Sequence, residues 1–441
     1  MLIIVIVPIW LAALVFFWAS KPTHEPILRL LASITLSYFV LWGVAFLWSN
    51  APGMEMAKRF LLTTVSIAFT VGFFELLVAA RVVDFRTAFG TPVYEPWAHP
   101  GNLLDKTLLH IHKPHDHWLW FGIDYSYDQH GLRNESDFET AELVVIGDSF
   151  IEGLGVSAAD LLTAHLPKLL PSTVANLGQS WYGPQQELEL LWRYGLPLRP
   201  KICVWTFFEG NDLADIARYN EATRDWENFS KRLHSFTERS FSKNALIAVR
   251  RLLESVKHSG APKDSGLTEI SGVFQLSTGE KKRLHFWYKG HHLSADDHRA
   301  VKELSSILRR AYEACCNSGA KFLVVLVPTK FRVYKEFAEF DSHARSRYWV
   351  VNGLPKMLEA VVRKKMPEAG FLDLTPAFKE QARRGSLVYF PYDSHWSPEG
   401  HRVAAAAIAD FVTRWEFNHS SGKKGSRIYR RVTPPGITEY R

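Results

Sequence analysis

Residues 143–156 read LVVIGDSFIEGLGV, and this stretch decides the fold. It opens with an apolar run over residues 143–146, as expected of a short strand that is buried on both faces of a parallel sheet. The strand is predicted to end at Gly147, and Asp148 and Ser149 follow in a tight turn. A serine in such a strand-to-helix turn lies at the carboxyl edge of the sheet, where open α/β sheets bind their ligands.

The chain beyond this stretch repeats the order of strand and then helix. Further apolar strands are predicted over residues 173–177, 202–208, 321–327 and 371–374. Helices are predicted over residues 161–170, 187–194, 296–317, 352–365 and 398–415. This alternation predicts a parallel sheet with helices on both faces.

Two serines are predicted to cap helices. Ser157 precedes the helix at 161–170, and Ser294 precedes the helix at 296–317 with Asp297 three residues further on. A serine hydroxyl in this position accepts a hydrogen bond from a free backbone N–H of the first turn. We therefore expect both helices to begin close to these residues.

A long excursion interrupts the α/β pattern at about residues 213–320. It contains a polar helical region over residues 221–257 and a predicted hairpin that turns at Thr278 and Gly279. An insertion beside a site is a natural lid or substrate-recognition element. A docking surface for a partner is the alternative interpretation.

The N-terminal 85 residues have a different composition from the remainder. Residues 2–20, 27–48 and 60–83 are apolar stretches, each close to the ~20 residues that a helix needs to span a bilayer. We predict a membrane anchor of three transmembrane helices over residues 1–85. A connector over 86–140, an α/β domain over 141–415 and a basic tail over 416–441 complete the predicted organisation.

Bulk composition restricts the class of partner. The 441 residues carry a net charge of +7, which suits anionic lipid headgroups or an acidic glycan. No basic motif with interleaved aromatic residues is present, so no nucleic-acid partner is predicted. The three cysteines form neither a disulfide framework nor a zinc pattern.

The connector contains four closely spaced histidines, and they raise the question of a metal site. Alternating histidines in a proline-containing loop lack a defined ligand set, so we predict a loop at the membrane surface or over the site, and neither a metal nor a cofactor. The histidines are His110, His112, His115 and His117.

Two further motifs supply partners for Ser149. Asn211 follows the strand at 202–208 and is predicted at the same sheet edge, where its amide can donate to a developing oxyanion. Asp393 and His395 lie in a loop that enters the C-terminal helix, with Ser397 as the predicted cap. Such a pair can supply a general base and the carboxylate that orients it. The alternatives are that Asn211 only caps a helix and that the other two form a loop salt bridge.

Together, GDSF at 147–150, GND at 210–212 and DSH at 393–395 resemble blocks I, III and V of the SGNH (GDSL-type) hydrolase superfamily. The resemblance implies a flavodoxin-like three-layer α/β/α fold. It also implies the site residues: Ser149 as nucleophile, His395 as base, Asp393 as its partner, and Asn211 with the Ser149 backbone N–H in the oxyanion hole.

Block II departs from the superfamily pattern. Relatives often read Asn-x-Gly-x-x-Gly there, and the last glycine donates its N–H to the oxyanion. In this chain Trp181 occupies that position in NLGQSWYG at 176–183. Either Trp181 donates its backbone N–H and narrows the acyl site, which we favour, or the register shifts and Gly178 donates.

The string DSHWSPEG at 393–400 is also similar to alginate-type polysaccharide O-acetyltransferases. In those relatives the Asp-His motif often precedes the serine motif, whereas here it follows. We predict a membrane-anchored serine esterase that acts on an acylated glycan or lipid-linked substrate. The alternatives are an O-acetyltransferase for an exported polysaccharide, with a multi-span acyltransferase partner, and a catalytically silent membrane module.

The resemblance also helps to predict on which side of the membrane the catalytic domain lies. Positive charges beside the apolar stretches lean slightly toward a cytoplasmic α/β domain. Exported glycans lie on the other side, and we predict a multi-pass protein whose catalytic domain is periplasmic or otherwise extracytoplasmic.

Overall fold

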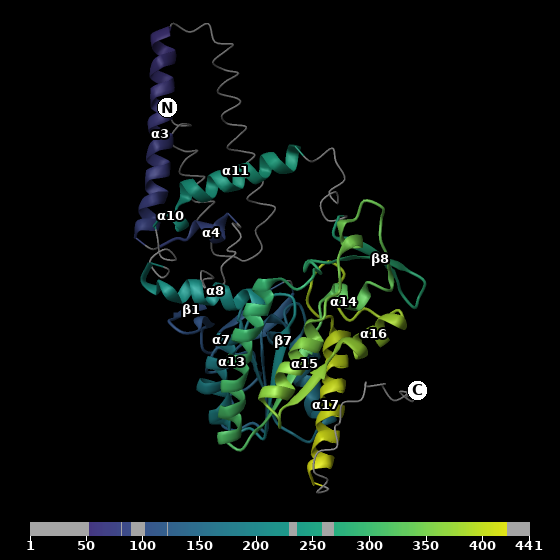
Figure 1. Cartoon of the computed structure of the whole chain (residues 1–441). Coiled ribbons are helices and arrows are strands. Elements are labelled where there is room, and N and C mark those ends of the chain that lie inside the picture. The colour runs from purple at the N-terminus through teal and green to yellow at the C-terminus, as the bar shows by residue number, and fades with distance from the viewer. Residues whose placement is uncertain are drawn as a thin grey trace. The chain divides into compact units, whose positions relative to one another are not determined.

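The computed structural model in Figure 1 describes residues 53–80, 82–89, 102–120, 122–228, 236–257 and 269–420. Contacts divide the chain into two compact units. One consists of residues 1–98 with 227–263, and the other consists of residues 99–226 with 264–441. The second unit contains the α/β domain.

The second unit is built on a five-stranded sheet in which every neighbouring pair is parallel. The strands are β5 (Leu143–Gly147), β6 (Val174–Gly178), β7 (Ile202–Phe208), β10 (Lys321–Val327) and β12 (Gly370–Asp373). All five predicted strands are therefore confirmed, with their ends shifted by at most one residue.

The strand order across this sheet is β12-β10-β7-β5-β6. Numbered along the chain, the order is 2-1-3-4-5, which is the flavodoxin-like arrangement. The order of winding reverses between β5 and β7, and ligands of open α/β sheets bind outside the carboxyl ends of the strands at such a point. Ser149 follows β5 and Asn211 follows β7.

Helices cover both faces of the sheet because successive strand side chains point to opposite sides. Val145, Val204 and Val325 belong to one buried cluster, whereas their neighbours Val144, Cys203 and Val324 belong to the other. The first cluster includes residues of α6 (Leu162–Leu169), α14 (Lys330–Tyr334), α16 (Thr375–Arg383) and α17 (Pro398–Ser420). The second includes residues of α7 (Pro184–Leu190), α8 (Asp212–Arg224), α13 (Ala295–Asn317) and α15 (Leu354–Lys365). The predicted three-layer arrangement is thus observed.

The two predicted serine caps have different outcomes. Ser294 accepts from the backbone N–H of Asp297 at 3.1 Å and forms a capping box, which confirms the start of α13. Ser157 instead donates its hydroxyl to Asp160 at 2.7 Å, beside the 3-10 turn η2 (Ala158–Asp160). Ser157 makes no capping hydrogen bond, and α6 begins only at Leu162, after the 3-10 turn.

The connector is not the predicted loop. It forms two antiparallel hairpins, which pair β1 (Asn102–Asp105) with β2 (Leu109–His112) and β3 (His117–Trp120) with β4 (Ile123–Ser126). All four residues of β2 are buried, two of them histidines, so the strand lacks the alternation that would reveal it in the sequence. Gly131 lies in the left-handed region, with a φ of 74°.

The insertion contains the predicted hairpin and separate helices. Strands β8 (Ser271–Gln275) and β9 (Lys281–His285) pair antiparallel, and Gly279 in their turn has a φ of 86°. β11 (Ala338–Glu339) adds a third strand beside β8. The helical region comprises the end of α8, α10 (Phe236–Arg239) and α11 (Phe241–Lys257).

In the first unit, part of the insertion contacts the N-terminal region. The long helix α3 (Gly53–Ala79) precedes the short helix α4 (Phe85–Ala88), and the rings of Phe74 and Phe85 lie 4.7 and 5.1 Å from that of Phe241 on α11. Glu75 accepts from the backbone N–H groups of Phe241 and Ser242 at 3.3 and 2.8 Å. Sequence reasoning did not predict that this part of the insertion is associated with α3.

Membrane-spanning potential is found in one helix of the described residues. Residues Leu61–Ala79 of α3 have the length and hydropathy to cross a membrane, and only 11% of that window is buried. The other two predicted spans, 2–20 and 27–48, lie outside the described residues, as does most of the basic tail. Three transmembrane helices are therefore not confirmed.

Candidate active site

The local structure around Ser149 forms a strand-to-helix turn. Residue 147 must be glycine, because a Cβ there would lie 2.0 Å from Thr206 Oγ1 on the neighbouring strand. Asp148 accepts from the backbone N–H of Phe150 at 3.0 Å and starts the short helix α5 (Ser149–Glu152). Ser149 is thus the first helical residue, and its N–H belongs to the first turn, which has no acceptors within the helix.

The structure brings Ser149 together with the predicted base. His395 Nε2 lies 2.8 Å from Ser149 Oγ, although 246 positions separate the two residues. The other ring nitrogen, Nδ1, bonds to Asp393 Oδ1, which also accepts from the His395 backbone N–H at 2.7 Å. A salt bridge between Asp393 and His395 alone would not account for the contact of His395 Nε2 with Ser149. The three residues form a continuous hydrogen-bonded chain.

Electrostatics favour ionised Asp393 in this chain. Partial burial works against ionisation, but the hydrogen bonds from His395 outweigh it and hold the pKa of Asp393 below its usual value. The carboxylate can therefore stabilise an imidazolium at His395 when it forms.

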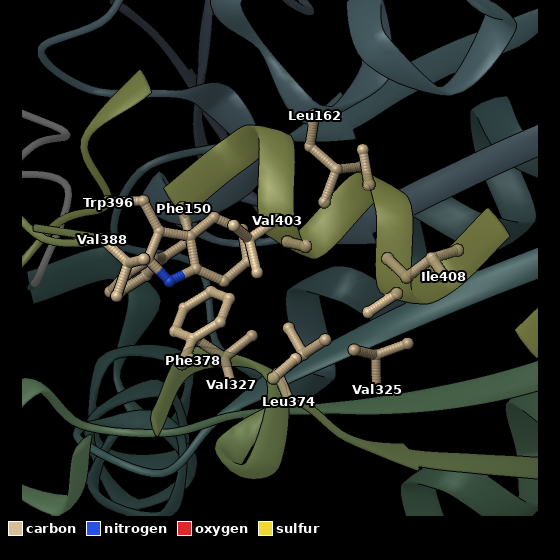
Figure 2. Packing of buried hydrophobic residues seen from close by; sticks show 14 of the residues in the cluster. Phe150, Leu162, Val325, Val327, Leu374, Phe378, Val388, Trp396, Val403 and Ile408 are labelled. Carbon is tan, nitrogen blue, oxygen red and sulfur yellow. The ribbon is translucent and has the colours of Figure 1, made fainter. Parts of the chain in front are cut away.

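Packing of the neighbouring residues brings the two site loops together. Phe150 follows Ser149 and Trp396 follows His395, and their rings lie 5.1 Å apart with an edge-to-face angle of 71°. Both side chains are buried, and Phe378 packs 5.5 Å from the indole (Figure 2). The aromatic contact fixes the distance between the nucleophile and base loops.

Lys330 donates hydrogen bonds to the loop that carries Asp393 and His395, here called the base loop. The sequence analysis did not predict this residue. Its ammonium group donates to the carbonyl oxygens of Phe390, Pro391 and Asp393 at 2.8, 3.0 and 2.5 Å. Burial lowers the pKa of Lys330 to about 7, although the charge of Asp393 opposes this shift. Its place just after strand β10, at the carboxyl edge of the sheet, was the available signal.

Asn211 lies at the same edge, at the start of α8. Its side chain makes no capping hydrogen bond, and its amide nitrogen donates to Asp215 Oδ2 at 2.7 Å. An amide nitrogen carries two hydrogens, so one is left to donate elsewhere. The cap alternative therefore does not account for this side chain.

Gly178 and Trp181, the two block II candidates, differ in whether the backbone N–H is free to donate to an oxyanion. The backbone N–H of Gly178 donates to Asn176 Oδ1 at 2.8 Å, and a Cβ on residue 178 would lie 2.2 Å from the backbone nitrogen of Glu152. Glycine is thus required there for close packing against α5. Trp181 has a φ of 69°, the left-handed conformation that glycine adopts without strain, and its side chain is 43% exposed.

Four buried carboxyl groups lie near the site. Burial raises the pKa of Asp148 to about 6 and that of Asp215 to about 7, and it also raises the pKa values of Glu187 and Asp212. Repulsion between the groups adds to the shift at Glu187 and Asp212. Among the described residues, no group of His, Cys, Asp and Glu side chains has an arrangement that could hold a metal ion.

Glu152 connects the site to the histidine-rich connector. Its carboxylate accepts from Tyr127 at 2.8 Å and from the backbone N–H of Ser180 at 2.6 Å, and it lies 3.0 Å from His112 Nε2. Burial opposes ionisation, but His112 and these hydrogen bonds lower the pKa of Glu152 to about 2. His110 lies 3.1 Å from the Ser180 carbonyl oxygen. The buried connector histidines therefore support the loop that carries Trp181.

The sheet order defines a flavodoxin-like α/β domain, and the hydrogen-bonded chain of Ser149, His395 and Asp393 lies at its carboxyl edge. Comparison with known families makes this more specific. Residues 286–433 match the family model of the SGNH hydrolase-like domain of acetyltransferase AlgX. The predicted resemblance to the SGNH superfamily and to alginate-type acetyltransferases is thus confirmed. The matched region contains Asp393 and His395, whereas Ser149 and Asn211 lie outside it.

One curated relative aligns over a short region. It is the protein named "Probable alginate O-acetylase AlgJ" from Pseudomonas putida, 28% identical over 121 residues, which cover 27% of this chain and 30% of the relative. The aligned part therefore spans less than a third of that protein.

Similar solved structures include an acetylxylan esterase from Geobacillus stearothermophilus, with 14% identity and a TM-score of 0.30 over 62% of this chain and 95% of that one. A G-D-S-L family lipolytic protein from Desulfitobacterium hafniense has 12% identity and a TM-score of 0.30, over 61% of this chain and 98% of that one. Likeness at this level carries no argument about function.

Proposed function

We propose that this protein is a serine acyl-transfer enzyme that acts on an O-acylated polysaccharide through an acyl-enzyme on Ser149. The observation that carries the proposal is the hydrogen-bonded chain from Ser149 Oγ through His395 to Asp393. This arrangement activates a hydroxyl that is otherwise a weak nucleophile.

The residues have defined roles in the first half of the proposed reaction. Ser149 Oγ attacks the ester carbonyl carbon while His395 Nε2 accepts the serine proton. Asp393 keeps the other proton on Nδ1 and stabilises the imidazolium. The oxyanion of the tetrahedral intermediate accepts from the Ser149 N–H, the Asn211 amide and the Trp181 N–H. The C–O bond of the ester then breaks, and His395 donates its proton to the departing alcohol.

The second half of the reaction depends on the acceptor. A water molecule or a sugar hydroxyl gives its proton to His395 and attacks the acyl carbon, and Ser149 leaves with that proton. Water gives an esterase, and a sugar hydroxyl gives an O-acetyltransferase. The match of residues 286–433 to an acetyltransferase family favours transfer as the second candidate.

Labelling with a fluorophosphonate probe tests the acyl-enzyme. We expect the full chain to label, Ser149→Ala to lose the label, and the matched surface variant Ser157→Ala to label like the wild type. Equal labelling of the wild type and Ser149→Ala would rule out Ser149 as nucleophile. A wild type that fails to label would favour the silent-module alternative.

Product analysis separates hydrolysis from transfer. The protein is incubated with an acetyl ester donor and oligosaccharides, and the products are weighed by mass spectrometry. Acetylated oligosaccharide would support the transferase, and free acetate alone would support the esterase.

We further propose that the α/β domain faces the periplasm or cell exterior and that membrane lipids and an acyl-donating multi-span protein are its partners. The apolar window of α3 supports attachment to a membrane. Alkaline phosphatase fused to the C-terminus should be active in cells. Fluorescence from a fusion protein that fails to mature after export would contradict this orientation.

A further inference from the structure

Trp181 is held in a backbone conformation that its side chain disfavours. A bulky residue in the left-handed region clashes with its own backbone, so the conformation persists only when the surroundings impose it. Its φ of 69° lies in that region. Some neighbouring group must therefore compensate for the strain.

Arg218 on α8 is one such neighbour, in addition to Glu152 and His110, which hold the preceding residue Ser180. Its Nη2 donates to the carbonyl oxygen of Trp181 at 2.8 Å, and its guanidinium carbon lies 5.4 Å from the centre of the indole ring. One side chain thus contacts both the backbone and the ring of Trp181. This hydrogen bond restrains the peptide between Trp181 and Tyr182, and the cation–π contact restrains the indole ring. The Trp181 N–H belongs to the preceding peptide, whose Ser180 carbonyl oxygen lies 3.1 Å from His110 Nε2.

Arg218 is also connected, through Asp215, to Asn211, the second candidate donor to the oxyanion. Arg218 Nη1 lies 3.0 Å from Asp215 Oδ1, and Asp215 Oδ2 accepts from the amide nitrogen of Asn211 at 2.7 Å. The Asp215 side chain is only 3% exposed, whereas that of Arg218 is 32% exposed. Four residues form one continuous chain of contacts: Trp181, Arg218, Asp215 and Asn211.

The backbone near Trp181 also lies directly against the start of α8. A Cβ on Gly183 would lie 2.6 Å from Asp215 Cβ, so only glycine permits this approach. The geometry therefore connects the block II loop rigidly to the helix that carries Asn211 and Arg218.

We infer that Arg218 and Asp215 are positioning residues, which hold the Trp181 N–H and the Asn211 amide at the separation that an oxyanion requires. In relatives with glycine at position 181, the left-handed conformation needs no such support. This chain uses an arginine–aspartate pair in its place. The inference rests on the proposed acyl chemistry.

Steady-state hydrolysis of p-nitrophenyl acetate by the full chain tests the inference. Removal of a whole oxyanion donor costs about 10²–10³-fold in kcat, and misplacement should cost less. We expect Arg218→Gln and Asp215→Asn to lower kcat by roughly 10- to 100-fold and to change KM by less than about 3-fold. Arg224→Gln, on the exposed side of the same helix, is the matched control.

A glycine at position 181 distinguishes positioning from a general structural role. Glycine adopts positive φ without strain, so the effect of Arg218→Gln should fall to a few-fold or less when Trp181→Gly is the background. Thermal unfolding of each variant checks that the fold is intact. An unchanged kcat for Arg218→Gln in the wild-type background, or the same loss in both backgrounds, would overturn the inference.

The activity of the wild type distinguishes failure of the proposed function from failure of the positioning role. If it neither hydrolyses the ester nor labels at Ser149, the proposed function fails and the positioning role fails with it. If the wild type is active and the Arg218 variants behave like Arg224→Gln, only the positioning role fails.

Discussion

The nucleophile half and the oxyanion half of the candidate site are held in different ways. Ser149, His395 and Asp393 bond directly to one another. Asn211 and Trp181, in contrast, are connected through Asp215 and Arg218. The nucleophile half is thus defined by its own functional groups, whereas the oxyanion half depends on neighbours that have no direct part in the proposed chemistry. Variants should therefore have distinct effects in the two halves.

Loss of the base should have the largest effect. His395→Ala is expected to lower kcat by about 10⁶-fold, because His395 Nε2 is the group within hydrogen-bond distance of Ser149 Oγ that accepts its proton in the proposed reaction. Adding Ser149→Ala should cost little more, since the two residues act as a unit. Steady-state ester hydrolysis measures both. If the loss of activity in the double variant equalled the product of the two single losses, Ser149 and His395 would not act as one unit.

Loss of the side-chain donor in the oxyanion half should have a smaller effect. Asn211→Ala is expected to lower kcat by about 10²–10³-fold with little change in KM, because the contact strengthens only as the oxyanion forms. Fluorophosphonate labelling of Ser149 should slow but persist. Glu221→Ala, at an exposed position of α8, serves as the control. A kcat within 2-fold of the wild type would mean that Asn211 does not contact the oxyanion.

Lys330 is a positioning residue of the nucleophile half, because it holds the loop that carries His395 and takes no direct part in the proposed chemistry. Lys330→Met removes three hydrogen bonds to the base loop and should lower kcat by roughly 10-fold or more, since a small displacement of His395 weakens its contact with Ser149. Lys201→Met, at an exposed ion pair with Glu142, is the matched control. Equal activity of the two variants would show that the loop keeps its position without Lys330.

The smallest effect concerns stability and pH. Burial lowers the pKa of Lys330 to about 7, so the unfolded chain binds more protons than the folded one between pH 7 and its usual value near 10.5. The free energy of unfolding should therefore rise with pH across this window, by at most about 1.4 kcal/mol per pH unit from this group. Thermal unfolding at pH 7 and pH 9 should show a smaller rise for Lys330→Met than for Lys201→Met. An equal rise would mean that Lys330 does not titrate in this range.

The sequence was sufficient to predict the groups that lie directly at strand ends. Apolar runs of five to seven residues locate β5 and β7, and polar residues after such runs converge at one sheet edge whatever the rest of the fold does. Ser149 and Asn211 follow from this rule. Asp393 and His395 follow from their two-residue spacing in a loop before a capped helix.

The supporting residues could not be predicted in the same way. Arg218 and Glu152 have ordinary positions in helices, where charged residues are usually on the surface, and their roles depend on partners 37 and 40 residues away or on loop geometry. The conformation of Trp181 is likewise set by tertiary contacts. Strand β2 was missed because its buried histidines are held by hydrogen bonds and leave no hydrophobic period.

The contact between Glu75 and the start of α11 has a practical consequence for producing the protein. Because residues 227–263 belong with the N-terminal unit, the chain passes between the two units three times. A shortened chain that begins at residue 99 would keep Phe241 but lose its aromatic neighbours on α3 and α4. The backbone N–H groups of Phe241 and Ser242, at the start of α11, would also lose their acceptor, the Glu75 carboxylate. A shortened form should therefore omit residues 227–263 together with residues 1–98.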